Sequence, residues 1–204
     1  VSIVKNVTPY EEMKLRMLNG THSFFAYVGL LSGYRTVSEC ANHPLFEKAA
    51  LALMQYEQQE TLTIKEIDLV KYAHNLIQRF QNNALEHQLT QIATDGSQKI
   101  PQRFIESLLW REAHNLDSPL LILSIAAWIT YVEQQVDQIA DSYQDRLAQI
   151  VHQAKDHEML IMSLLQSNIF PPQFHQSPKL SSQIIESYLL IEQLDAEKAL
   201  FTLL

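Results

Sequence analysis

The chain has little cysteine, glycine or charge: one cysteine, four glycines and 19% charged residues among 204. A single thiol, Cys40, excludes an internal disulfide framework and fits a reducing compartment, so we expect a cytoplasmic protein. The glycines form no G-x-G-x-x-G pattern, so the sequence offers no usual turn for a dinucleotide phosphate. The sequence also lacks G-x-S-x-G, which argues against a serine nucleophile of the hydrolase type.

Basic residues are also scarce. Fifteen Lys and Arg stand against 23 Asp and Glu, for a net charge of −8, and no basic cluster stands out. Nucleic acid and anionic membranes are therefore poor candidates as partners. The most apolar stretch, residues 120–132, includes Ser124 and Thr130 and is shorter than the roughly 20 residues that span a bilayer. We expect a buried helix there.

What the chain does have is a large apolar fraction, 47%, which is enough for a sizeable core. No strand pattern, repeat or low-complexity tract stands out, so the sequence predicts one all-α domain over residues 1–204. The first residue is Val1, and no signal-peptide pattern follows it. We therefore expect the chain to lie within a longer gene product.

Prolines and capping residues predict where the helices begin. Thr8, Pro9 and Glu11 have the pattern of a capping box, which predicts a long helix that passes His22 and ends within residues 29–33. The other expected helices are 44–59, 67–80, 84–94, one capped by Ser97, 120–135, 141–165 with a break near Lys155, and 178–203. Pro171 and Pro172 mark the clearest break in the second half.

The first long helix carries Lys14, Asn19 and His22 within nine residues. An amine can transfer a proton to a carbonyl or alcohol, while an amide and an imidazole can form hydrogen bonds to the reacting oxygen. On an ideal helix, Asn19 lies about 140° and His22 about 80° from Lys14. Convergence on one atom therefore requires long side chains or a distortion near Gly20. Without further evidence, a solvated lysine and a core histidine would be the ordinary interpretation.

A second block, D-G-S-Q-K-I-P-Q-R at residues 95–103, contains Lys99 and follows Gln91. Together with K-L-R-M-L-N-G-T-H-S from Lys14, it resembles the C-terminal domain of the long-chain mannitol dehydrogenase family, which includes polyol 2-dehydrogenases and hexuronate reductases. The fructuronate reductase (D-mannonate oxidoreductase) branch is the most similar. The resemblance runs from about Pro9 to the C-terminus, and the two blocks in this order are far more specific than either alone.

The resemblance implies roles for five residues. Lys14 would be the general acid/base, Asn19 and His22 would bind and orient the substrate oxygen, and Lys99 and Gln91 would bind the substrate. Polyol-oxidising relatives carry arginine at the position of Gln91, so its glutamine favours a keto-uronate or sugar acid as substrate. The resemblance further implies NAD, held mainly by a preceding Rossmann domain that this chain does not contain, and no metal.

Three alternatives stay open. The enzyme could reduce tagaturonate, or it could be a mannitol 2-dehydrogenase, since a few contacts decide sugar stereochemistry. From a different class, the chain could be a helical binding or assembly module without activity. We expect this chain to be inactive when it is separated from its nucleotide domain. The separated chain should also expose an apolar surface near the Lys14 helix, through which it could self-associate.

Overall fold

The computed structural model describes residues 7–84 and 86–204. Within these ranges the regular structure is helical, apart from one isolated antiparallel bridge between Thr36 and Gln88. The predicted all-α fold is confirmed. No helix among the described residues is long and apolar enough to cross a membrane.

The helices of the first half include several π-helical turns, labelled η. They are α1 (Thr8–Met13), η1 (Lys14–Asn19), α2 (Gly20–Phe24), η2 (Phe25–Gly29), α3 (Val37–Asn42), α4 (Pro44–Ala52), η3 (Leu53–Gln58), the 3-10 turn η4 (Gln59–Thr61), α5 (Leu69–Phe80), α6 (Leu89–Ile92), α7 (Gly96–Ile100) and η5 (Pro101–Ile105). The second half contains α8 (Glu106–Ala113), α9 (Pro119–Gln135), α10 (Gln144–Gln153), α11 (His157–Leu165), α12 (Pro172–His175), α13 (Pro178–Leu194) and α14 (Ala196–Thr202).

The core is built around α9. This helix is apolar on all sides, and every residue from Leu120 to Thr130 is buried, as expected for a helix enclosed by others. It packs against α13, η2 and η3. Because the buried apolar residues of the described chain form one cluster, the packing fits the single domain over 1–204, which stays a prediction.

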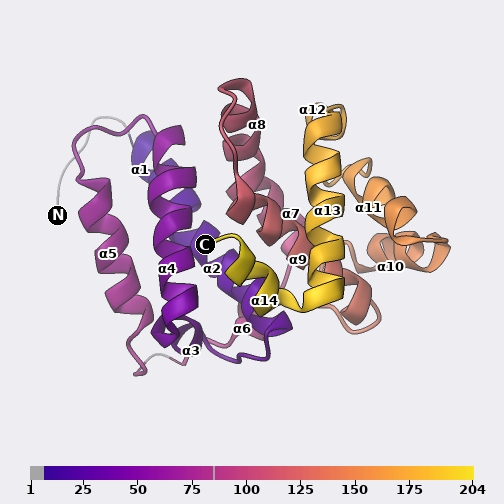
Figure 1. Ribbon diagram of the computed structural model, residues 1–204, viewed down its shortest axis with the longest axis horizontal. Coiled ribbons are helices and arrows are strands. Elements are labelled where there is room, and N and C mark those ends of the chain that lie inside the picture. Colours follow the sequence, from indigo (N-terminus) through magenta and orange to yellow (C-terminus); the bar gives the residue numbers. More distant parts are fainter. Residues whose placement is uncertain (1–6, 85) are drawn as a thin grey trace.

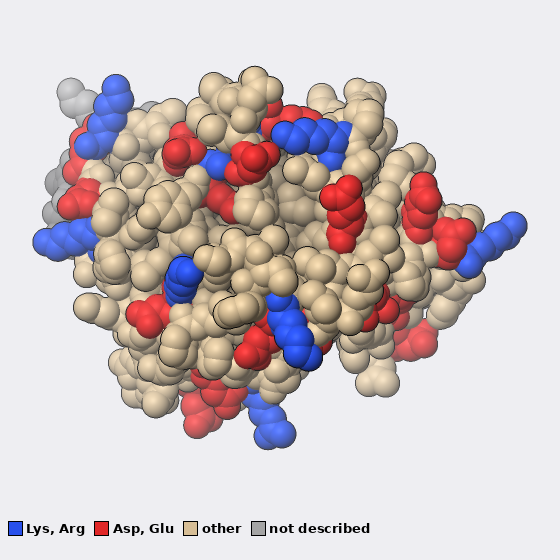
Figure 2. Space-filling model, in the orientation of Figure 1, with Lys and Arg blue, Asp and Glu red and all other residues tan. Residues whose placement is uncertain are grey.

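The helices are spread along one axis of the molecule. Figure 1 shows α4 and α5 at one end, α8, α9 and α13 in the middle, and α10 and α11 at the other end. The face seen in Figure 2 carries acidic and basic side chains interspersed, without an extended basic area. The turn that bears Lys14, η1, packs against η3 and η5.

The start of the first helix differs from the prediction. Thr8 is the first helical residue, the N-cap position falls on Val7, and Val7 makes no side-chain capping bond. The predicted capping box at Thr8 and Glu11 is therefore wrong. A complete capping box occurs instead at Thr36 and Glu39, where it starts α3, a helix that is not among the predicted ones.

Other boundaries follow the predictions in part. The break near Lys155 is confirmed, because α10 ends at Gln153 and α11 begins at His157. Within the expected helix 84–94, only Leu89–Ile92 is helical, and residue 85 lies outside the described residues. The expected helix 178–203 divides at Asp195, whose φ of 77° is incompatible with a continuous helix.

Candidate active site

Lys14 lies at the start of a π-helical turn. The helical path runs from Thr8 to residue 31 and contains two π turns, η1 from Lys14 to Asn19 and η2 further on. A π turn closes hydrogen bonds from residue i to i+5, so it is wider than an α turn and rotates less per residue. This turn supplies the distortion expected near Gly20, because it ends at the residue before that glycine.

A pocket of about 230 Å³ opens beside this turn. It is lined by Lys14, Leu18, His22, Val37, Arg79, Phe80 and His87. Two of the three predicted catalytic residues, Lys14 and His22, therefore face one cavity. Asn19 is not among the lining residues. It is half-buried, and its main-chain oxygen accepts a hydrogen bond from Arg103 Nη1 at 3.1 Å.

The environment of His22 keeps its imidazole neutral. Burial, together with the smaller effects of Arg103, His87 and Arg79 in that order, lowers the pKa of His22 to about 4. The ring packs at 4.8 Å from the Phe80 ring and 6.3 Å from the His87 ring, measured between centroids. At neutral pH, His22 can therefore donate or accept a hydrogen bond without carrying charge.

Lys99 and Gln91 lie apart from this pocket but meet at one turn of the chain. Lys99 Nζ donates to the Ile92 carbonyl at 3.1 Å and to Thr94 Oγ1 at 3.3 Å. Thr94 Oγ1 in turn donates to the Gln91 carbonyl at 2.9 Å, and the Gln91 side chain is exposed. Burial lowers the pKa of Lys99, and the neighbouring Arg103 guanidinium lowers it further.

The segment that carries Lys99 begins differently from the prediction. The helix α7 starts at Gly96, after Asp95 in a left-handed conformation with φ 50°. Ser97 lies inside the helix, so its predicted role as the cap is wrong. Its amide instead donates to Asp141 Oδ2 at 2.9 Å, and its hydroxyl donates to the same carboxylate. A carboxylate distant in sequence thus satisfies the first turn of α7.

Arg103 connects the two groups of predicted residues. Besides Asn19, it donates to Ser23 Oγ at 2.7 Å, and its charge lowers the pKa of both His22 and Lys99. Arg103 is the last residue of the D-G-S-Q-K-I-P-Q-R block, but the sequence alone indicates no role for it. Its position in η5, which packs against η1, could not be derived from local sequence.

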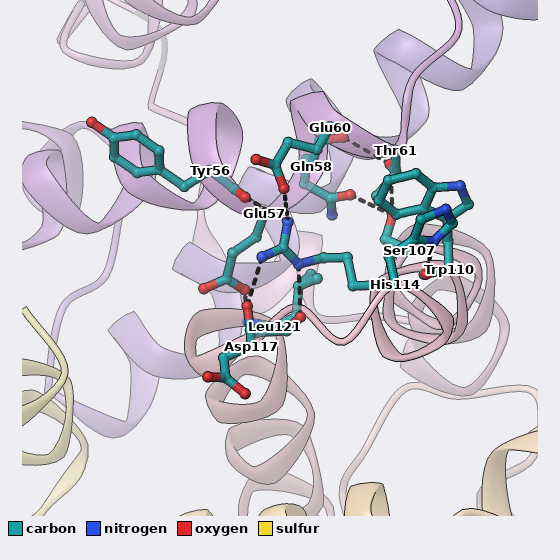
Figure 3. A network of polar contacts seen from close by, with 12 residues as sticks. Tyr56, Glu57, Gln58, Glu60, Thr61, Ser107, Trp110, His114, Asp117 and Leu121 are labelled. Atoms are coloured by element: carbon teal, nitrogen blue, oxygen red, sulfur yellow. Dashed lines mark hydrogen bonds and ion pairs between the residues drawn. The ribbon is translucent and has the colours of Figure 1, made fainter.

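Buried polar contacts on the core side of η1 and η5 hold these π turns in place. Figure 3 shows the network around η3, η4 and α8, where Ser107 Oγ donates to Gln58 Oε1 at 2.6 Å. Gln58 Nε2 donates to the Arg103 carbonyl at 3.2 Å. Arg16, two residues after Lys14, donates to the Thr61 carbonyl at 2.7 Å and is 8% exposed. These contacts fix the backbone that carries Lys14.

Other features do not form a competing site. A larger cavity of about 600 Å³ lies between the start of α9 and α13, and none of the five predicted site residues lines it. Among the residues that the structure describes, no group of three or more His, Cys, Asp or Glu could hold a metal ion. The large exposed apolar side chains include none from residues 14–24, so self-association through that helix stays a prediction.

Comparisons with known proteins identify the fold. Residues 6–192 match the profile of the mannitol dehydrogenase C-terminal domain. The structure resembles Pseudomonas fluorescens mannitol 2-dehydrogenase, solved as a ternary complex with NAD and D-mannitol, with a TM-score of 0.90 and 31% identity over 98% of this chain and 42% of that chain.

Curated relatives agree with this match. The oxidoreductase YeiQ of Escherichia coli, itself uncharacterized, is 39% identical over 100% of this chain and 43% of its own length. The D-mannonate oxidoreductase of Escherichia coli is 39% identical over 91% of this chain and 39% of its own length. The chain thus spans about two-fifths of the length of these relatives.

Proposed function

This chain belongs to the mannitol dehydrogenase family, whose C-terminal domain it matches, and we propose that it is the substrate-binding and catalytic half of an NAD-dependent fructuronate reductase (D-mannonate oxidoreductase). The observation that carries the proposal is the placement of Lys14 and His22 in one pocket beside a π turn. Turns of this kind are rare and are frequent at functional sites. The reaction interconverts a keto-uronate and a sugar acid.

Proton transfer is assigned to Lys14. During reduction, the ketone carbon gains a hydride and its oxygen becomes an alkoxide, which takes a proton from Lys14 Nζ. The neutral His22 imidazole donates a hydrogen bond to the same oxygen and stabilises its developing charge. Asn19 is proposed to orient this oxygen when substrate binds. Oxidation of the sugar acid reverses these steps.

Lys99 and Gln91 are proposed to hold the remote part of the substrate. Lys99 is half-buried, and among the described residues its ammonium donates hydrogen bonds only to oxygens of residues 92 and 94. A compact cation of this kind can bind a hydroxyl or carboxylate oxygen. Gln91 lies on the same turn with an exposed amide, which offers both a donor and an acceptor to a sugar.

The dinucleotide is assigned to a preceding domain. The usual dinucleotide fold needs a strand before its glycine-rich turn, and no named strand occurs among the described residues. NAD supplies the hydride acceptor or donor when it is bound. A Rossmann domain N-terminal to this chain would hold it against the Lys14 pocket, so the isolated chain is expected to be inactive.

The first experiment is an assay of NADH oxidation by the full-length gene product. D-fructuronate, D-tagaturonate and D-fructose are offered in parallel at equal concentration. Selective turnover of fructuronate supports the proposal, while preference for tagaturonate or fructose would assign the chain to the tagaturonate reductases or the mannitol 2-dehydrogenases. Inactivity with all three would favour a non-catalytic helical module.

A Lys14→Ala variant tests the assigned mechanism. Loss of general acid/base catalysis should lower kcat at least about 100-fold in the full-length enzyme. Lys155→Ala is the matched control, because it removes an exposed lysine between α10 and α11, far from the pocket. Equal turnover by the wild type and the Lys14 variant would remove Lys14 from the mechanism.

A further inference from the structure

The pocket that contains Lys14 and His22 has basic side chains in its lining. Its titratable residues are Lys14, His22, Arg79 and His87, and no Asp or Glu among the residues that the structure describes lines it. The chain as a whole carries 23 acidic residues against 15 basic ones. The two cationic side chains, Lys14 and Arg79, without a described carboxylate in the lining, produce a local positive potential, which concentrates anionic ligands.

Arg79 differs from the other arginines near the site. Arg16, Arg103 and Arg111 each donate hydrogen bonds to carbonyl or side-chain oxygens. Arg79, in the last turn of α5, makes no side-chain hydrogen bond or ion pair with any residue that the structure describes, and the same holds for Lys14. Two cationic groups therefore face the pocket with their donors free.

The charges of this cluster lower the pKa of His22. Arg79 and His87 both lower its pKa, in addition to burial and Arg103, so the imidazole is in a positive environment. A neutral polyol would leave this positive potential uncompensated. A carboxylate would compensate it, and the planar guanidinium of Arg79 can bind a carboxylate through two parallel hydrogen bonds.

We propose that Arg79 and His87 bind the carboxylate of the sugar-acid substrate while its reacting oxygen lies at Lys14 and His22. The inference rests on the proposed function and adds a site for the acid group. Arg79 comes from α5, and His87 comes from the loop before α6. This loop is held against the start of α3 by the bridge between Thr36 and Gln88 and by a hydrogen bond from the Val37 amide to the His87 carbonyl. The walls between them are the apolar side chains of Leu18, Val37 and Phe80.

The test uses steady-state kinetics of the full-length enzyme with Arg79→Gln and His87→Gln. Removing a charged hydrogen-bond partner of a carboxylate should raise KM for the uronate about 10- to 100-fold for Arg79→Gln, with a smaller rise for His87→Gln. KM for NADH should stay within about twofold of the wild type. Arg146→Gln is the matched control, because it removes an exposed arginine on α10, at the opposite end of the molecule.

A structural defect would look different from loss of a carboxylate contact. Arg79→Lys keeps the positive charge but loses the planar guanidinium that can form two parallel hydrogen bonds to a carboxylate. Its KM for the uronate should therefore lie between those of the wild type and Arg79→Gln. A general defect in folding would instead lower the thermal midpoint and kcat of both variants together.

Three further outcomes would overturn the inference. A rise in KM for NADH with unchanged KM for the uronate would assign Arg79 to a phosphate of the dinucleotide. If the wild type is active on a uronate and its KM and kcat are unchanged in Arg79→Gln and Arg79→Lys, the carboxylate site is refuted while the proposed function stands. A wild type that turns over neither uronate would refute the proposed function and this inference together.

Discussion

Replacing the buried Glu57 by glutamine should change how the stability of the chain depends on pH. Glu57 is 4% exposed, and its carboxylate accepts the amides of Leu120 and Leu121 at 2.9 and 2.8 Å at the start of α9. Burial raises the pKa of Glu57 to about 7, although these two amides and Arg111 oppose the rise. Figure 3 shows Glu57 beside Leu121 and Asp117.

The sign and size of the effect follow from linkage between folding and proton binding. The folded pKa of Glu57 is above the ordinary value of 4.5, so this group favours the folded state below pH 4.5, and its contribution is lost as pH rises to about 7. The total loss is about 3 kcal/mol at 1.36 kcal/mol per pKa unit. Between pH 5 and pH 8 the loss amounts to about 2 to 3 kcal/mol.

The wild type alone would not reveal this loss. His22 has a pKa lowered to about 4, so its contribution is absent below pH 4 and is gained as pH rises toward its unfolded value of 6.5. The two groups therefore act in opposite directions between pH 4.5 and 6.5. Comparing wild type with Glu57→Gln cancels the contribution of His22 and isolates that of Glu57.

The assay is urea unfolding followed by far-ultraviolet circular dichroism at pH 5 and pH 8. The free energy of unfolding of the wild type relative to Glu57→Gln should fall by about 2 to 3 kcal/mol between these pH values. Glu158→Gln, which changes an exposed carboxylate on α11, is the control. A wild-type-minus-variant difference that is constant with pH would refute the reasoning.

Three further predictions concern the site and its supports. His22→Gln should lower kcat about 100-fold in the full-length enzyme. A step in the pH dependence of wild-type kcat between pH 6 and 8 that disappears in this variant would contradict a His22 pKa of about 4. Arg103→Gln should lose the bonds to Asn19 and Ser23 and lower the free energy of unfolding by about 2 kcal/mol, and an unchanged urea midpoint would contradict this. Because burial raises the pKa of Cys40 to about 12, a thiol reagent should label the native chain at least about 100-fold more slowly than the chain in urea, and equal rates would contradict this.

Sequence predicted the helices well wherever local signals define their ends. Pro44, Pro119 and Pro178 each fall at the start of a helix, because proline fits the first turn and lacks the amide that would stay unpaired there. The missed helix α3 also had a local signal, since Thr36 and Glu39 have the spacing of a capping box. The same spacing of Thr8 and Glu11 starts no capping box, so the pattern alone does not decide which of the two positions caps a helix.

The contacts that shape the site could not be predicted in this way. The π turn at Lys14 is stabilised by packing of η1, which ends at Asn19, against η3 and η5, which begin at Leu53 and Pro101. Arg79 and His87 reach the pocket from a helix and a loop that carry no motif. Ser118 has the form of a cap, but its hydroxyl accepts from Arg111 while the distant Glu57 caps α9.

The position of Arg16 shows how such distant contacts serve catalysis. In the turn η1, Arg16 points inward and binds Thr61 and Glu106, while Lys14 in the same turn is exposed at the pocket. A buried guanidinium must keep all its hydrogen bonds, because an unpaired buried charge is costly. The hydrogen bonds that fix Arg16 therefore also fix the backbone of the same turn, which carries Lys14. A fixed backbone lowers the cost of aligning the lysine with a reacting oxygen, which is the main advantage of a preorganised site.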